Sequence, residues 1–136
     1  MGDHLARCRV LLVEDDEDGA MLMVMSLERA GAEVHHAPSL AAAFALLADS
    51  PFQVLVSDLE LPDGTGVELV SRCRVEWPEL ALRALALTGH ADAATASRLC
   101  AAGFSDVLAK PVLPDALVAR VIEIAGRDIL PVTPVR

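Results

Sequence analysis

Residues 54–64 read Val-Leu-Val-Ser-Asp-Leu-Glu-Leu-Pro-Asp-Gly, and this stretch decides the fold. It opens with a short apolar run that ends at Asp58, and Pro62-Asp63-Gly64 is a strong turn signal before a helical pattern. Short apolar runs of this kind are typical of strands buried in a parallel sheet. We therefore expect Asp58 at the carboxyl end of such a strand, where open α/β sheets bind their ligands.

Apolar runs alternate with helical patterns five times along the chain. Strands that alternate with helices of about 10–15 residues indicate βαβ units with right-handed crossovers. The sequence therefore predicts an α/β fold, a doubly wound five-stranded parallel sheet. The expected strands are Arg9–Val13, Glu33–Ala37, Val54–Asp58, Ala84–Leu87 and Asp106–Ala109, and the expected helices are Asp18–Ala30, Leu40–Ala48, Gly66–Glu76, Ala91–Ala101 and Pro114–Ala125.

Length and composition limit the kind of protein that this chain can be. A chain of 136 residues is enough for one domain, which we place at residues 9–126, with residues 1–8 as an N-terminal extension and 127–136 as a tail. Aromatic residues make up only 3%, so the core should be aliphatic. The net charge of −9 argues against a nucleic-acid surface. No signal-peptide pattern and no run of roughly 18 apolar residues is present, so we expect a cytoplasmic protein without membrane contact.

Polar residues stand at four of the expected strand ends. Glu14 and Asp15 follow the first strand, Asp58 ends the third, Thr88 follows the fourth and Lys110 follows the fifth. The carboxyl ends of parallel strands meet at one edge, so these side chains should converge on one pocket. Three carboxylates brought together repel one another unless a cation compensates them. Mg²⁺, or Mn²⁺ in its place, is such a cation, since it takes oxygen ligands and accepts a phosphate oxygen as well.

Lys110 and Thr88 fit a pocket that also receives a phosphoryl group. Lys110 would be the counter-charge to the acids and a donor to a phosphoryl oxygen. Pro111 restricts Lys110 to an extended conformation, and a cis bond between them is one option. Thr88 could donate a hydrogen bond that exists only when the phosphoryl group is present, and a difference of this kind is what a switch requires.

Taken together, these motifs resemble the response regulator receiver domain, over about Arg9 to Ala125. The residues that carry the resemblance are Val13-Glu14-Asp15, Asp58 with Pro62-Asp63-Gly64, Ala86-Leu87-Thr88-Gly89, and Ala102-Gly103-Phe104 with Lys110-Pro111. The resemblance implies a flavodoxin-like fold with strand order 2-1-3-4-5. It also implies that a phosphohistidine of a histidine kinase or of a histidine phosphotransfer protein donates a phosphoryl group to an aspartate.

The resemblance also assigns roles to individual residues. Asp58 would be the phospho-acceptor, and Glu14, Asp15, Asp58 and the backbone carbonyl of Glu60 would hold the metal ion. Thr88 and Lys110 would contact the phosphoryl oxygens. Glu60 and His90 would tune dephosphorylation, unless they are two independent solvated side chains.

One position departs from the family pattern. Family members commonly carry an aromatic residue three positions before the lysine, where it turns inward on phosphorylation. Here that position is Val107, and the chain contains no tyrosine. Phe104 lies earlier, in a loop, and we do not assign it this role. The family resemblance therefore leaves transmission through the last strand open.

The first helix should present an apolar surface beside the pocket. Helical spacing predicts that Leu22, Met23, Ser26, Leu27 and Ala30 face the core and that Ala20, Met21, Val24 and Met25 face outward. A contiguous patch containing methionine suggests a docking surface for a partner helix. We assign partner docking to Met21, Val24 and Met25, with self-association into a homodimer and incidental exposure as the alternatives.

The sequence thus predicts a phospho-accepting signalling domain, either a stand-alone regulator or the receiver of a hybrid kinase. We expect no enzyme activity beyond its own phosphorylation and dephosphorylation. One alternative is a degenerate receiver that acts as a binding scaffold. The other is an aspartyl-nucleophile phosphohydrolase of the haloacid dehalogenase type, which usually has Asp-x-Asp after its first strand and a cap domain.

Overall fold

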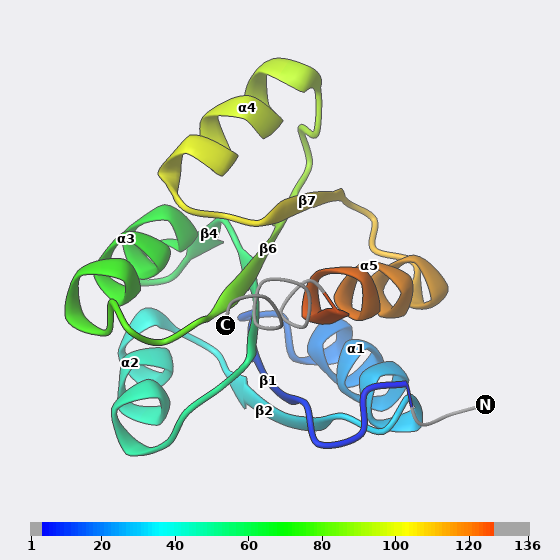
Figure 1. Cartoon of the computed structure of the whole chain (residues 1–136). Helices are drawn as coiled ribbons and strands as arrows, with labels where there is room; N and C mark the ends of the chain where they lie inside the picture. Colours follow the sequence, from blue (N-terminus) through cyan, green and yellow to red (C-terminus); the bar gives the residue numbers. More distant parts are fainter. Residues whose placement is uncertain (1–3, 127–136) are drawn as a thin grey trace, which may run out of the picture.

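Five parallel strands form one sheet at the centre of the molecule (Figure 1). The structure is a computed structural model and describes residues 4–126. The strand order β2-β1-β3-β6-β7 is the predicted order 2-1-3-4-5, because a separate two-stranded hairpin supplies β4 and β5. The five strands are β1 (Arg9–Val13), β2 (Glu33–Ala37), β3 (Val54–Asp58), β6 (Arg83–Thr88) and β7 (Asp106–Ala109).

Helices cover both faces of the sheet, so the predicted doubly wound architecture is confirmed (Figure 1). The helices α1 (Glu17–Arg29) and α5 (Pro114–Gly126) pack on one face, and α2 (Leu40–Asp49), α3 (Gly66–Glu76) and α4 (Ala93–Ala102) pack on the other. Expected and observed bounds differ by at most two residues. The largest difference, at the start of α4, arises because Asp92 caps this helix by accepting a hydrogen bond from the Thr95 N–H.

The core is aliphatic, as predicted, and lies on both sides of the inner strands. All five residues of β3 are buried, and among the largest fully buried side chains only Phe52 is aromatic. Full burial of one such side chain contributes about 1.5–3 kcal/mol to folding. The extension predicted at residues 1–8 also reaches the core, because Leu5 is buried and its N–H donates to the Ala30 carbonyl. The tail predicted at 127–136 lies outside the described residues.

The inner face of α1 differs from the prediction. Leu22 is 60% exposed, whereas Ala20 is 1% exposed and belongs to the core. The buried positions of this helix are three or four residues apart and form one stripe: Ala20, Met23, Leu27 and Ala30. Compared with the expected stripe, the helix is rotated slightly about its axis. Val24 is partly buried against this core. The outward apolar face therefore consists of Met21, Leu22 and Met25.

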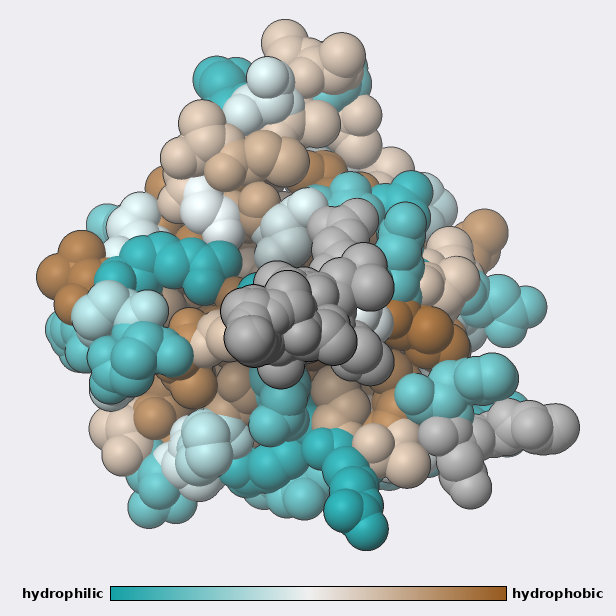
Figure 2. All heavy atoms as spheres, in the orientation of Figure 1, coloured by the Kyte–Doolittle hydropathy of each residue, from teal (hydrophilic) through white to brown (hydrophobic). Residues whose placement is uncertain are grey.

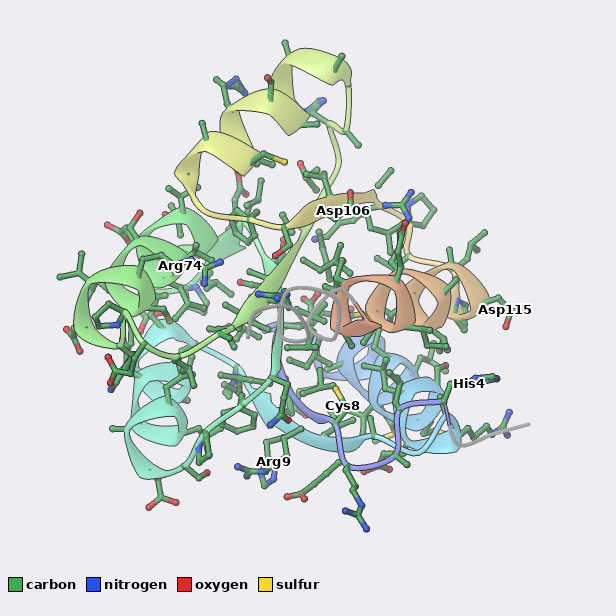
Figure 3. All side chains as sticks on the ribbon, viewed as in Figure 1. His4, Cys8, Arg9, Arg74, Asp106 and Asp115 are labelled. Carbon is green, nitrogen blue, oxygen red and sulfur yellow. The ribbon has the colours of Figure 1, made fainter. Side chains whose placement is uncertain are left out.

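Arg74 joins two helices to the sheet. Its guanidinium points inward from α3 (Figure 3), and it donates to the Leu82 carbonyl at 2.7 Å and to the Gly103 carbonyl at 2.6 Å. The first of these carbonyls precedes β6 and the second follows α4. This one side chain therefore holds the loop after α4 against α3.

The loop after Asp58 contains a feature that the sequence analysis missed. Residues Glu60–Leu61 (β4) and Gly64–Thr65 (β5) pair as a short antiparallel hairpin around the predicted turn. Asp63 at its tip accepts hydrogen bonds from the Leu40 N–H at 2.8 Å and the Ala41 N–H at 3.0 Å. These are the first two N–H groups of α2, which helical hydrogen bonds leave without partners. Asp63 therefore ties the loop after β3 to the start of α2.

We predict that Asp63→Ala lowers the urea midpoint of unfolding at neutral pH. The hydrogen bonds from Leu40 and Ala41 hold the pKa of Asp63 below its usual value of about 3.8. The stabilisation is therefore present above about pH 4 and is lost as the pH falls through the lowered pKa. The difference between parent and variant should shrink on acidification. Asp49→Ala, at the exposed end of the same helix, is the matched control, and an equal loss in both variants would contradict the assignment.

Candidate functional site

The predicted polar residues meet at the carboxyl edge of the sheet. Asp58 and Thr88 are the last residues of β3 and β6, while Glu14, Asp15 and Lys110 directly follow β1 and β7. The parallel register aligns the three inner strands, since Val13 lies opposite Ser57 and Asp58 lies opposite Leu87. Asp15, Asp58, Thr88 and Lys110 line one open hollow of about 830 Å³.

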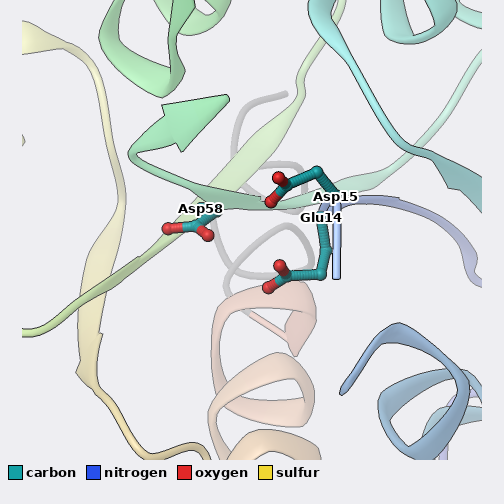
Figure 4. A group of neighbouring side chains, drawn as sticks. All are labelled: Glu14, Asp15 and Asp58. Atoms are coloured by element: carbon teal, nitrogen blue, oxygen red, sulfur yellow. The ribbon is translucent and has the colours of Figure 1, made fainter. Parts of the chain in front are cut away.

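Three carboxylates form the acidic part of this site (Figure 4). One carboxylate oxygen from each of Glu14, Asp15 and Asp58 lies within 4.8 Å of the others. Glu14 is 6% exposed and Asp58 is 7% exposed, whereas Asp15 is open to solvent. The two buried carboxylates cannot rely on water to disperse their charge, so the cluster is electrostatically costly.

The pKa of the Glu14 carboxyl is shifted by this environment. Burial raises the pKa of the Glu14 carboxyl, and the nearby Asp58 and Asp15 raise it further. The Asp16 N–H, which donates to Glu14 Oε2 at 3.0 Å, and the Lys110 charge lower it in part. The net effect is a raised pKa for Glu14, with burial as the largest cause.

Lys110 is the one cation in direct contact with this cluster among the described residues. Its Nζ lies 2.8 Å from Asp58 Oδ2. Partial burial would lower the pKa of Lys110, but the hydrogen bond and charge of Asp58, together with the charges of Glu14 and Asp15, raise it overall. The Lys110–Pro111 peptide bond is cis, which was one of the options expected from the sequence. The Lys110 N–H donates to the Thr88 carbonyl at 2.8 Å, so the ends of β6 and β7 stay together.

Thr88 places a hydroxyl at the wall of the hollow. The side chain is 7% exposed, and its Oγ1 accepts a hydrogen bond from the His90 N–H at 3.1 Å. That bond uses an acceptor position and leaves the hydroxyl hydrogen able to donate. Thr88 can therefore donate to an oxygen that enters the hollow.

Glu60 and His90 also line the hollow, as expected. Both residues are exposed, and within residues 4–126 no hydrogen bond or ion pair joins their side chains. Three further residues that were not predicted also line the hollow, namely the α4 N-cap Asp92 and, within α4, Thr95 and Arg98. Their spacing of three residues puts them on one face of the helix, and this was the available signal.

The residues present fit a divalent cation. The three carboxylates carry a formal charge of −3 and Lys110 carries +1, which leaves −2 at the site. All the available side-chain ligands are carboxylate oxygens, which Mg²⁺ prefers, and the open hollow leaves room for water and for a further oxygen ligand. The acidic group is therefore suited to Mg²⁺ on grounds of charge and ligand chemistry.

Comparison with known proteins identifies the family that the sequence motifs resemble. Residues 10–122 match the response regulator receiver domain. The response regulator receiver protein CpdR of Brucella abortus is 36% identical over 103 residues, which cover 76% of this chain and 84% of that protein. The virulence sensor protein BvgS of Bordetella bronchiseptica is 35% identical over 131 residues, which cover 93% of this chain but 11% of that protein.

Solved structures show the same fold. The chemotaxis response regulator CheY4 of Vibrio cholerae superimposes with a TM-score of 0.81 at 27% identity, over 86% of this chain and 98% of that one. The receiver domain of HemR from Leptospira biflexa gives a TM-score of 0.79 at 29% identity, over 88% of this chain and 95% of that one. Within residues 4–126, no helix combines the length and the apolar character that crossing a bilayer requires.

We predict that Asp15→Asn stabilises the metal-free protein at neutral pH, because it removes one of three mutually repelling charges. The gain should be about 0.5–1 kcal/mol, the scale of an exposed charge contact. It should disappear when Mg²⁺ is added, since the parent then gains a cation that the variant holds less well. Urea unfolding with chelator and with Mg²⁺ measures both effects.

The pH dependence provides a second check on Asp15→Asn. The pKa of Glu14 lies above its ordinary value of 4.5 in the folded protein, so the metal-free parent should lose stability as the pH rises through and above that value. The Asp15→Asn variant should lose less stability over the same pH range, because it lacks one of the charges that raise the pKa of Glu14. Glu79→Gln removes an exposed charge elsewhere and should leave the profile unchanged. A lower stability of Asp15→Asn in chelator would refute the charge argument.

Proposed function

Since this chain belongs to the response regulator receiver domain family, we propose that it accepts a phosphoryl group on Asp58 and thereby switches its interactions with other proteins. One observation carries the proposal. The Asp58 carboxylate is nearly buried at the edge of the sheet, with Lys110 at 2.8 Å on one side and two more carboxylates on the other. This arrangement supplies a nucleophile, a counter-charge and ligands for a divalent cation in one place.

In the proposed reaction an Asp58 carboxylate oxygen attacks the phosphorus of a phosphohistidine. The new O–P bond forms as the P–N bond breaks, and the donor imidazole leaves with the electron pair. Glu14, Asp15, Asp58 and the Glu60 backbone carbonyl would hold Mg²⁺, which when bound offsets the negative charge that builds up on the phosphoryl oxygens.

Lys110 and Thr88 would distinguish the two states of the switch. Lys110 pairs with Asp58 in the unmodified protein and would contact a phosphoryl oxygen after transfer. The Thr88 hydroxyl would donate to a second phosphoryl oxygen. Both contacts favour the modified state only, which is the differential interaction that a population shift needs. Glu60 and His90, on the wall of the same hollow, would set the access of the water that later cleaves the acyl phosphate.

Val107 bears on how phosphorylation would be transmitted, because it stands where the family resemblance leads us to expect an aromatic residue. The Val107 side chain is buried in β7, and the Val107 backbone carbonyl accepts a hydrogen bond from the Arg120 guanidinium at 2.7 Å. A buried valine has no ring to move between solvent and core. We infer that the response to phosphorylation concentrates in the loop after Thr88 and the start of α4, which line the hollow.

The proposal predicts that Asp58 is labelled by a small phosphate donor. Incubation with acetyl phosphate and Mg²⁺ should add one phosphate to the intact mass, and chelator or Asp58→Asn should abolish the addition. Asp49→Asn, which lies at the end of α2 away from the hollow, should label like the parent. If the parent protein takes up no phosphate, the scaffold alternative is favoured. If Asp58→Asn is labelled like the parent, the phospho-acceptor is a residue other than Asp58.

The apolar face of α1 is suited to docking the phosphohistidine donor. Met21 is 62% exposed and Met25 is 48% exposed on this face. Leu22 beside them lines a groove of about 350 Å³ together with Lys110, Pro111, Val112 and Pro114. The groove thus connects the apolar face to the lysine that pairs with Asp58. Val24, which we also assigned to docking, is partly buried and would contribute only the edge of its side chain.

A double substitution tests this surface. Met21→Glu with Met25→Glu should slow phosphotransfer from the cognate phosphohistidine protein by at least about tenfold, equivalent to about 1.4 kcal/mol, while labelling by acetyl phosphate stays near the parental rate. Val75→Glu is the matched control, because Val75 is 78% exposed on α3, over which Figure 2 shows a separate apolar patch. Equal losses with both phosphate donors would indicate damage to the fold instead.

A further inference from the structure

The peptide that joins two of the acidic residues is bonded to the neighbouring strand. The Glu14 carbonyl accepts a hydrogen bond from His36 Nε2 at 2.6 Å, and the Glu14 N–H donates to the Ala37 carbonyl at 3.1 Å. A carbonyl oxygen can only accept, so His36 Nε2 must carry the hydrogen. Both backbone polar groups of Glu14 are therefore held by the last two residues of β2.

This bond fixes the orientation of two carboxylates at once. The Glu14 carbonyl belongs to the rigid planar unit that connects Glu14 to Asp15. Rotation of that unit would swing both side chains relative to Asp58. The hydrogen bond from His36 opposes this rotation, because turning the carbonyl away would leave a partly buried imidazole N–H without its partner.

His36 itself is part of the central sheet, which fixes its position. It pairs with Leu12 in the register of β1 and β2, and it lies on the sheet face that carries Val34 and α1. His35, the preceding residue, points to the opposite face, where its ring contacts Phe52 and its Nε2 lies 2.8 Å from Glu33. The two neighbouring histidines thus have separate surroundings, and only His36 reaches the acidic site.

We propose that His36 is a positioning residue for the metal centre, which orients Glu14 and Asp15 for a divalent cation through the carbonyl between them. The inference rests on the proposed function, since it requires Mg²⁺ to bind this site. Groups that orient metal ligands typically change metal affinity by about 10–100-fold when they are lost.

The test compares two side chains of similar size. His36→Gln keeps an amide N–H that can donate to the Glu14 carbonyl, whereas His36→Met removes the donor. Calorimetric titration of the full chain with Mg²⁺ should show affinity at least about tenfold weaker for His36→Met and within about threefold of the parent for His36→Gln. His35→Leu should bind like the parent. Equal affinities of parent and His36→Met overturn the inference, whereas a parent that binds no Mg²⁺ overturns the proposed function instead.

A second measurement does not depend on the metal. The Asp15 amide shares the peptide unit that His36 holds, so its NMR resonance in metal-free protein should shift in His36→Met and stay close to the parent in His36→Gln. Retained shifts at the core strands show that each variant is folded. An Asp15 resonance that does not move in a folded His36→Met protein also overturns the inference.

Discussion

The electrostatic strain at the carboxyl edge of the sheet is the constraint on which the rest of the structure depends. Glu14, Asp15 and Asp58 place carboxylate oxygens within 4.8 Å of one another, and within residues 4–126 Lys110 forms an ion pair with Asp58 only. A protein could relieve this repulsion by letting the loops move apart. Here hydrogen bonds hold the loops to neighbouring elements, so the free energy of binding a cation or a phosphoryl group at this site would not be spent on assembling it.

Hydrogen bonds between elements hold those loops together. His36 and Ala37 of β2 bind the backbone of Glu14, Asp63 binds the start of α2, and Lys110 binds the end of β6 through its own N–H. Each bond joins the end of one strand to a different element. These bonds hold the site to the β2–α2 corner and to the sheet, and the hollow beside it is open to solvent.

Two further features lie close to this site. Val107 of β7 is packed into the core, and the aromatic residue that the family resemblance leads us to expect at this position is absent. On α1, exposed Met21, Leu22 and Met25 lie next to a groove that ends at Lys110. The unbranched, flexible methionine side chains suit a surface that must adapt to a partner helix. In the function proposed above, the phosphohistidine donor docks on α1 and the response to phosphorylation runs through the loop after Thr88.

The sequence by itself determined the βαβ order, the parallel sheet and the convergence of Asp58, Thr88 and Lys110, because short apolar runs and the residues that end them are local patterns. It did not determine which side of α1 faces inward, because a small rotation of the helix keeps Met23, Leu27 and Ala30 in the core but exchanges Leu22 for Ala20. Nor did it indicate the hydrogen bonds that His36 and Asp63 make to the backbone of other elements. Their partners lie 22 and 23 residues away, and no local pattern records a side chain that bonds to the backbone of another element. Only the packing of β1 against β2, and of the hairpin against α2, brings these groups together.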